Sequence, residues 1–333
     1  MATIKDVAKE AGVSIATASR VINNAPHTSK AATQAVHIAM KKLGYRPNAN
    51  ARALATKQSN AIGVLVGDVS APFFGTMVRA IEGIASEQER QLLIGSGDHN
   101  ADKERNAINL LLNSGCESLV VHSKGLSDEE LTALADEVPG LVLINRIVPS
   151  IASRCIALDN VKGAYLATEY LIRNGHRHIG YLASSHDIDD AHDRKQGYLQ
   201  ALADNNIPVR EEYIEIAEPD ELGGEQAMVN LLAKNTPITA ITTYNDDMAA
   251  GCLALLHENE IRIPEDMSLI GFDDSHISRF IYPRLTTIRY PIQVMANKAV
   301  KLSLQLANNQ EVDIDENRLF MPILVRRASV SRI

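Results

Sequence analysis

Polar side chains that could bind a ligand follow several short apolar runs of the sequence. These side chains belong to Asp68, Ser70, His122, Asn145, Arg146, Asn245 and Asp273. If the runs are parallel strands, their carboxyl ends are where open α/β sheets bind ligands. Carboxylates and amides, with a guanidinium from Arg146 or Arg194, suit a ligand with several hydroxyls. For any one Asn or Asp, capping of the next helix is the better explanation, whereas several together favour ligand contact.

The sequence contains none of the common enzyme signatures. Residues 92–100, LLIGSGDHN, place Gly95 and Gly97 after an apolar run, but Asn100 stands where the dinucleotide fingerprint needs a third glycine. There is no GxxxxGK[ST] phosphate loop and no GxSxG elbow, and HENEI at 257–261 lacks the second histidine of a zinc protease. We therefore predict no catalytic residues and no cofactor, and we do not expect an enzyme.

One segment is dense in potential metal ligands. Residues 186–194 read HDIDDAHDR, which could form a hard-cation site, a polar ligand site or an exposed acidic loop. The spacing of the carboxylates fits no standard metal motif, so no metal site is predicted.

From Ala61 onward, short apolar runs alternate with amphipathic helical patterns. The runs span residues 61–67, 92–97, 118–122, 141–145, 155–159, 178–183, 238–244 and 268–274. Alternation of this kind is typical of parallel sheets with crossover helices. Because the runs are too many for one small sheet, we predict an α/β fold with two doubly wound parallel-sheet lobes that divide near residue 160.

The first 58 residues differ from the rest in charge. They contain nine Lys and Arg against two acids, a balance of +7, whereas the remainder carries 24 basic and 39 acidic residues, a balance of −15. This asymmetry indicates an N-terminal module that seeks a polyanion.

The same segment predicts three short helices, an all-α head in front of the α/β lobes. Gly12 can end the first helix, Ser14 can cap the second, and Ser29 or Thr28 can cap a third that Gly44 ends. Two helices joined by a tight turn and supported by a third match the helix-turn-helix signature.

The second predicted helix, within VSIATASRVIN at 13–23, has an unusual outward face. Its inner residues are Ala18, Val21 and Ile22, which leaves an outward set of Ile15, Ala16, Ser19, Arg20 and Asn23. An isoleucine and an alanine on a water-facing stripe suggest that something other than water covers it. Residues 45–60 then form a connection with too few large apolar side chains to fold alone.

Targeting and redox signals are few. The opening residues lack a signal-peptide core and no stretch approaches a bilayer span, so we expect a cytoplasmic protein with no membrane partner. Cys116, Cys155 and Cys252 are scattered and lack a CxxC pairing, which predicts reduced, buried thiols.

Residues 3–23, TIKDVAKEAGVSIATASRVIN, closely resemble the opening of the LacI/GalR family of transcription repressors. The resemblance extends along the chain through RPNANARALA, GVLVGDVSAPFF, DRKQGY, YNDDMAAG, LIGFDD and PRLTTIRYP. It implies a helix-turn-helix head followed by a periplasmic-binding-protein-like core. Several segments are most like galactose-responsive members, and Trp, which stacks on the sugar in some relatives, is absent.

The resemblance also implies how DNA is bound. Ile15, Ala16 and Arg20 would read base edges in the major groove, with Arg20 donating two hydrogen bonds to guanine or, alternatively, meeting only phosphate. The other implied DNA contacts are Thr3, Ser14, Thr17, Ser19, Asn23 and Asn48. Leu54 matches the hinge leucine that is wedged between base pairs in relatives, and could otherwise only join a small hydrophobic contact.

For the effector, the resemblance implies a pocket between the lobes. Its predicted residues are Phe73, Phe74, Asn145, Asp190, Arg194, Asn245, Asp273 and Tyr290, of which Asp190 and Tyr290 are the weaker candidates. The expected effector is a small sugar, with D-galactose as the first candidate inducer. Another sugar or a purine corepressor is the alternative within the family.

We therefore predict a homodimeric repressor that binds near-palindromic operator DNA and is released by its sugar. A sugar-binding protein without DNA function is the alternative from another class, but it would not explain the +7 head. The predicted divisions are residues 1–45 (head), 46–60 (hinge), 61–160 with 291–320 (first lobe), and 161–290 with 321–333 (second lobe).

Overall fold

The computed structural model describes residues 2–22, 28–45, 61–313 and 318–333. The chain forms two compact units, a head within residues 1–59 and a core within residues 60–333. The predicted contacts Asn23, Asn48 and Leu54 lie outside the described residues, as does the whole predicted hinge. Among the described helices, none has the length and apolar character needed to cross a membrane.

The head contains three helices around a small core. They are α1 (Ile4–Glu10), α2 (Ile15–Ile22) and α3 (Lys30–Leu43). The buried residues that hold them together are Val7, Ala8, Ala18, Val21, Val36 and Ala39. Ala18 and Val21 were predicted to face inward, and both are buried.

The predicted helix ends of the head are confirmed. Gly12 has a positive φ of 65° after α1, and the amides of Gly12 and Val13 donate to the carbonyls of Lys9 and Ala8, which completes a Schellman motif. The Ser14 hydroxyl accepts the amide of Thr17 at 3.0 Å at the start of α2. The turn between α1 and α2 is therefore fixed by local hydrogen bonds.

The core contains two six-stranded sheets. The first has the order β11-β5-β4-β3-β1-β2 and the second β12-β10-β9-β8-β6-β7. The strands of the first are β1 (Ala61–Val66), β2 (Gln91–Ser96), β3 (Ser118–Val121), β4 (Gly140–Ile144), β5 (Cys155–Leu158) and β11 (Leu319–Phe320). Those of the second are β6 (Ile179–Ser184), β7 (Ile214–Ala217), β8 (Ala240–Thr243), β9 (Ser268–Asp273), β10 (Thr286–Arg289) and β12 (Ile323–Val325). We call the layers around them the first and second lobes.

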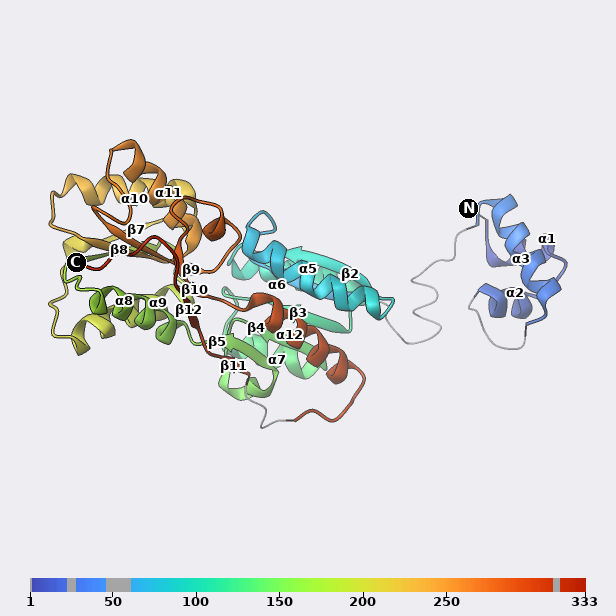
Figure 1. Ribbon diagram of the computed structural model, residues 1–333. Coiled ribbons are helices and arrows are strands. Elements are labelled where there is room, and N and C mark those ends of the chain that lie inside the picture. The colour runs from blue at the N-terminus through green and yellow to red at the C-terminus, as the bar shows by residue number, and fades with distance from the viewer. Residues whose placement is uncertain (1, 23–27, 46–60, 314–317) are drawn as a thin grey trace. The chain divides into compact units, whose positions relative to one another are not determined.

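Helices cover the faces of both sheets. Those of the first lobe are α5 (Pro72–Glu87), α6 (Ala101–Asn113), α7 (Asp128–Glu137) and α12 (Ile292–Ala307), with the 3₁₀ turn η1 (Pro149–Arg154). Those of the second are α8 (Asn160–Arg173), α9 (Asp189–Asp204), α10 (Glu221–Ala233) and α11 (Asp246–Glu258), with η2 (Glu211–Tyr213) and η3 (Ile277–Arg279). In Figure 1, α12 lies beside α5 although more than 200 residues separate their starts. The chain therefore passes between lobes after β5, after β10, and between β11 and β12.

The prediction of an all-α head followed by two doubly wound lobes is confirmed, with two differences in the strands. β7, β10, β11 and β12 were not among the predicted runs, because they are short or carry polar residues. β12 pairs antiparallel with β10, so the second sheet is not wholly parallel. The three cysteines are free and buried, as predicted, and burial raises the pKa of Cys116 to about 11.

Close approach of α8 and α9 depends on a glycine. A Cβ at Gly197 in α9 would clash with the Val161 carbonyl oxygen and approach the amide of Tyr165 within 2.8 Å, both in α8. Gly197 lies three residues after Arg194, so the same contact places the start of α9. By contrast, a Cβ at Gly83 in α5 would meet nothing within 4 Å.

These two helical glycines should respond oppositely to alanine. Gly197→Ala should lower the free energy of unfolding of the core by roughly 1–3 kcal/mol, because the helices must separate. Gly83→Ala should raise it by roughly 0.5–1 kcal/mol through helix propensity. Urea unfolding followed by circular dichroism measures both, and equal effects would contradict the packing role of Gly197.

Candidate functional site

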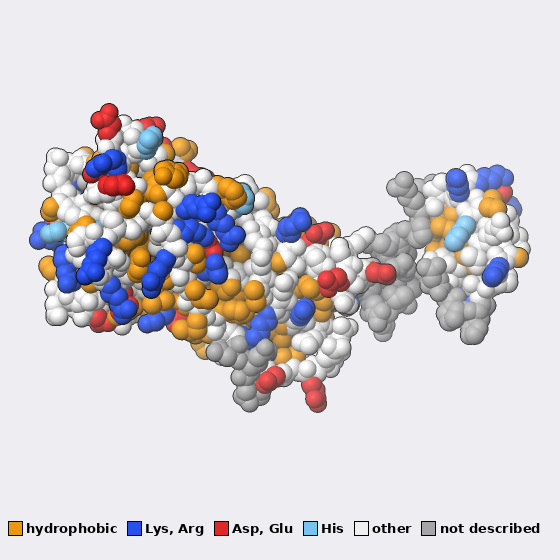
Figure 2. All heavy atoms as spheres, viewed as in Figure 1, with side chains coloured by type: hydrophobic (Ala, Val, Ile, Leu, Met, Phe, Trp, Pro, Cys, Tyr) orange, Lys and Arg blue, Asp and Glu red, His pale blue; other side chains and the backbone are white. Residues whose placement is uncertain are grey.

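The outward face of α2 is exposed in the head. Ile15 has an exposed fraction of 48%, and Ala16 and Arg20 are also exposed, whereas Thr17 and Ser19 are partly buried. Lys and Arg side chains outnumber Asp and Glu on the face of the head seen in Figure 2. The head therefore exposes apolar side chains on α2 and carries an excess of positive charge.

Two predicted DNA contacts also serve the helix ends. The Thr3 hydroxyl donates to Asp6 at 2.8 Å and accepts the Asp6 amide within a capping box, and Ser14 caps α2. Both residues are exposed at helix N-termini, where backbone amides favour phosphate. Their contact with DNA stays a prediction.

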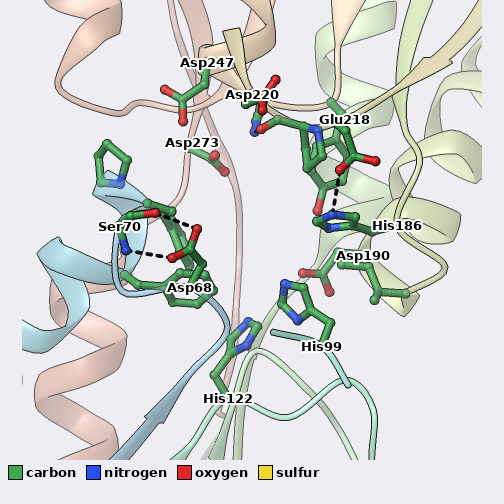
Figure 3. A pocket seen from close by; sticks show the side chains of 18 of the residues that line it. Asp68, Ser70, His99, His122, His186, Asp190, Glu218, Asp220, Asp247 and Asp273 are labelled. Carbon is green, nitrogen blue, oxygen red and sulfur yellow. Dashed lines mark hydrogen bonds and ion pairs between the residues drawn. The ribbon is translucent and has the colours of Figure 1, made fainter. Parts of the chain in front are cut away.

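A cavity of about 570 Å³ lies between the two lobes of the core. Residues from strand ends and following loops of both sheets line it, as Figure 3 shows. Seven of the predicted effector residues line this cavity: Phe73, Phe74, Asn145, Asp190, Arg194, Asn245 and Asp273. The strand-end residues Asp68, Ser70 and His122 line it too. The strand-end rule and the resemblance thus converge on one cleft.

Tyr290 lies elsewhere. It is not among the residues that line this cavity but lines a neighbouring one of about 500 Å³, and its ring packs edge-on against Phe73 with centroids 5.0 Å apart. Tyr290 is 4% exposed, so it supports the aromatic wall from behind.

Arg194 is the buried cation of the cleft. It is 3% exposed, donates to Asn160 at 3.0 Å and to the Tyr244 carbonyl at 2.6 Å, and pairs with Asp273 at 3.4 Å. Its guanidinium carbon lies 3.7 Å from the ring centroid of Phe272. These contacts leave it charged and immobile at the cavity wall.

Asp190 is held by donors from the opposite lobe. The Lys124 ammonium lies 2.6 Å from one carboxylate oxygen, and the Asn145 side-chain amide donates to the other at 2.5 Å. Burial alone would raise the pKa of Asp190, but Lys124 and Arg194 hold it below its ordinary value. Asp190 is therefore ionised and already bonded.

Three histidines that the sequence analysis did not bring together meet in the cleft. The ring of His99 lies 5.7 Å from that of His122 and 5.3 Å from that of His186, which itself lies 3.2 Å from Glu218. Burial lowers the pKa of His122 to about 3, so this ring is neutral. The Nδ1 atoms of His99 and His122 have no hydrogen-bond partner among the residues that the structure describes. In the sequence, His122 was noted as a strand-end residue and His186 as part of the ligand-dense segment 186–194, but nothing indicated that they would meet His99.

The second-lobe rim is acidic. Burial raises the pKa of Asp273 to about 7 although Arg194 opposes it, and burial with nearby Glu221 raises that of Asp247 to about 6. No group of three His, Cys, Asp or Glu side chains in the described parts of the chain is arranged to hold a metal ion.

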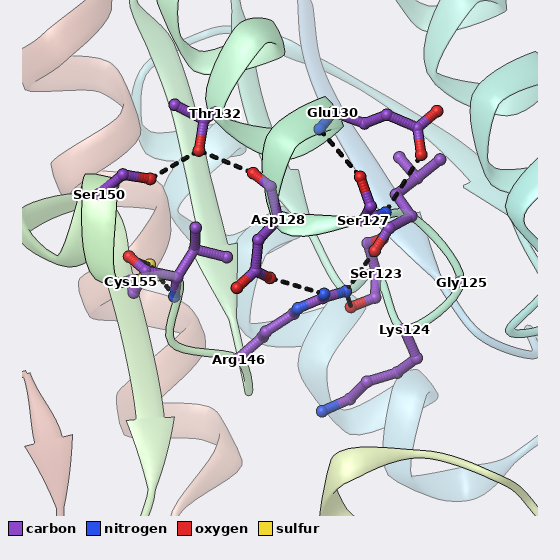
Figure 4. Close-up of polar contacts among 12 residues, drawn as sticks. Ser123, Lys124, Gly125, Ser127, Asp128, Glu130, Thr132, Arg146, Ser150 and Cys155 are labelled. Atoms are coloured by element: carbon purple, nitrogen blue, oxygen red, sulfur yellow. Dashed lines mark hydrogen bonds and ion pairs between the residues drawn. The ribbon is translucent and has the colours of Figure 1, made fainter.

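Arg146 does not line the cavity, which corrects its candidacy as a ligand cation. Its guanidinium donates to the carbonyls of Ser123 and Leu126 and pairs with Asp128 at 2.8 Å, as Figure 4 shows in part. Arg146 instead secures the loop between β3 and α7.

A helix-turn-helix head with an exposed face and a two-lobed core with a central cavity define a ligand-responsive transcription regulator. A family model for bacterial regulatory proteins of the lacI family matches residues 3–48, and one for a periplasmic binding protein-like domain matches residues 168–330. The chain belongs to the LacI family of DNA-binding transcriptional repressors.

Individual relatives are similar over almost their full length. The chain is 54% identical to the HTH-type transcriptional regulator GalR of Escherichia coli (strain K12), covering 99% of this chain and 96% of that protein. It is 52% identical to GalS of Salmonella typhimurium (strain LT2), covering 99% and 97%. A crystal structure of the Lac repressor dimer bound to operator and the anti-inducer ONPF matches with a TM-score of 0.85 at 28% identity, covering 99% of each chain. The chain is thus a GalR-like member of the family.

The structural role of Arg146 is testable. Arg146→Met should lower the free energy of unfolding by roughly 1.5–3 kcal/mol, since it leaves two buried carbonyls without their charged donor. The matched control is Arg105→Met, which removes ion pairs to Asp102 and Glu130 at an exposed position and should cost less than about 1 kcal/mol. Urea unfolding compares them, and equal losses would contradict the role of Arg146.

Proposed function

We propose that the protein represses a sugar-utilisation operon, binds its near-palindromic operator as a homodimer, and releases it when D-galactose enters the cleft. The main support for this class of effector is the charge of the side chains that line the cavity. Eight carboxylates line it, against one guanidinium and three histidines. Such a surface disfavours anions and suits a neutral ligand with many O–H donors.

The shape of the cavity supports a sugar over other neutral ligands. Phe73 and Phe74 form an aromatic wall, with ring centroids 5.3 Å apart, on the side contributed by the first lobe. Asn145, Asn245 and Asp273 supply polar atoms elsewhere in the lining. A pyranose has an apolar face for such a wall and hydroxyls for such a rim. The likeness of this chain to GalR and GalS supports galactose as the first candidate effector.

The head supports the DNA part of the proposal. Ile15 and Ala16 can meet thymine methyl groups, and Arg20 can donate to guanine, while Thr3, Ser14, Thr17 and Ser19 meet phosphates. Asn23, Asn48 and the hinge leucine Leu54 complete the proposed DNA contacts. Two heads on one palindromic site require two chains, and a Lac repressor structure similar to this chain is a dimer on its operator.

Calorimetric titration of D-galactose into the full chain tests the effector, with D-fucose, ribose and hypoxanthine as comparisons. We expect heat with galactose, and none with hypoxanthine. Asp273→Asn should weaken galactose binding about tenfold, because a charged acceptor of hydroxyl protons is lost. Affinity of the unmodified chain should fall as the pH drops through about 7, where Asp273 gains a proton, and this dependence should vanish in the variant.

The control for this titration is Asp266→Asn, an exposed second-lobe carboxylate paired with Arg262, which should leave galactose affinity unchanged. Absence of heat with galactose would overturn the galactose assignment, and heat with hypoxanthine would favour a purine effector.

The reading role of Arg20 is tested on DNA. Operator sequences selected from a random library serve as the specific ligand, and unselected duplex as the nonspecific one. Arg20→Ala should lower operator affinity by roughly 1–3 kcal/mol with little effect on random DNA. Lys41→Ala, an exposed cation on α3, should affect both DNAs alike. Equal losses with Arg20→Ala would assign Arg20 to phosphate.

A further inference from the structure

Lys124 forms a buried ion pair that joins the two lobes. It lies in the loop between β3 and α7 of the first lobe, and its partner Asp190 lies in the first turn of α9 in the second. The nitrogen-to-oxygen distance is 2.6 Å, and the side chains are 1% and 7% exposed. The same ammonium donates to the Asn145 carbonyl at 2.5 Å. A lysine this buried is rare, so its position needs a reason.

The loop that carries Lys124 is fixed from both sides. Buried Glu104 on α6 accepts the backbone amides of Lys124, Gly125 and Leu126 at 3.0–3.1 Å and the Ser123 hydroxyl at 2.5 Å. Arg146 holds the carbonyls of the same loop. Three backbone amides and two carbonyls of the loop are thus bonded to side chains of the first lobe. Lys124 is presented to the second lobe on a rigid support.

The other end of the contact is equally constrained. Asp190 receives Lys124 on one oxygen and Asn145 on the other, so two first-lobe residues converge on one second-lobe carboxylate. α9 also carries Arg194, which is bonded to the ends of β8 and β9. A shift of Asp190 relative to Lys124 therefore moves the whole second-lobe wall of the cavity.

Separation of the lobes has a steep energetic consequence at this point. Breaking the pair without admitting water would leave two unpaired charges in a buried site, which is strongly unfavourable. An intact, dry pair and a wider arrangement that hydrates both groups are therefore each more favourable than a partly separated, dry pair. The pair favours the first over any intermediate lobe angle.

We propose that Lys124, acting through Asp190, is the positioning residue that latches the lobes at the angle seen in this structure. The ligand consequence rests on the proposed function. Because Lys124 and Asn145 already bond to Asp190, the effector binds other groups. One of them is the Asn145 side-chain oxygen, which is buried and has no partner within residues 61–313 or the other described ranges. At the latched angle residues of both lobes line one cavity, so we assign the effector to this angle. By linkage, the latch then raises effector affinity and lowers operator affinity.

The test measures the distance between lobes in the ligand-free chain. Spin labels are attached through Glu137→Cys on α7 and Gln226→Cys on α10, both exposed, while the three native cysteines are buried. Labelled chains are diluted into a large excess of unlabelled ones, so that pulsed electron resonance reports distances within one chain. Lys124→Met and Asp190→Asn should each broaden and lengthen the distance distribution.

The double variant Lys124→Met with Asp190→Asn leaves no unpaired buried charge, so it remains informative where a single variant fails to fold. We expect its distance distribution to be broad and shifted to longer distances as well, because the ion pair between the lobes is gone. Lys103→Met is the matched control: its ion pair with Asp98 is also 2.6 Å long but is exposed and lies within the first lobe. It should keep the unmodified distribution.

A latch and a merely structural pair give different results. Lower melting temperatures with unchanged distances in the Lys124 and double variants would overturn the proposal. In the effector arm, Lys124→Met should weaken D-galactose binding by at least about fivefold and strengthen operator binding in saturating galactose. If the unmodified chain binds neither galactose nor operator, the proposed function fails, and the ligand-free distances still decide the latch.

Discussion

The core is organised around a guanidinium, that of Arg194, which is 3% exposed at the cavity wall. A charge buried to this degree must be paired and hydrogen-bonded, since its desolvation would otherwise cost several kcal/mol. Arg194 meets this condition with acceptors from three places: the first residue of α8, the loop after β8 and the end of β9. Phe272 and Tyr244 cover its faces. The requirements of one side chain therefore fix the spatial relation of four elements, and with it one wall of the cleft.

Much of this arrangement can be predicted from the sequence, for identifiable reasons. β1, β3 and β4 are buried along their whole length, so they read as continuous apolar runs. β7 has one buried residue among its four, and β11 has two residues, so neither produces such a run. In the site, Asn145 and Asp273 were found because they end strands. Lys124 was not, because a lysine in a loop looks solvent-exposed until the fold places Asp190 opposite it. The same holds for Glu104, whose burial depends on the loop that wraps it.

Charge divides the protein into two parts with different partners. The head carries a surplus of Lys and Arg and exposes apolar side chains on α2 beside Arg20. Water solvates these apolar side chains poorly, whereas the major groove of DNA offers thymine methyl groups that they can contact. The cavity lining is the reverse, with carboxylates in excess. A polyanion is therefore attracted to one unit and repelled from the cavity of the other. Recognition of DNA and of a neutral ligand can coexist in one chain without competition for the same surface.

Four of the ten described non-glycine residues with positive φ angles line the cavity. Asp98, His99, Asn145 and Asp273 all have positive φ angles, of 53°, 52°, 61° and 110°, and all four line the cavity. Such conformations cost side-chain-bearing residues of order 1–3 kcal/mol each and persist only where surrounding contacts impose them. At Asn145 those contacts are visible: its amide donates to Ile156, its carbonyl accepts Lys124, and its side chain donates to Asp190. The strained turn presents the Asn145 carboxamide to both the opposite lobe and the cavity. Local preference is overridden at this strand end because Asn145 bonds to residues of both lobes at once.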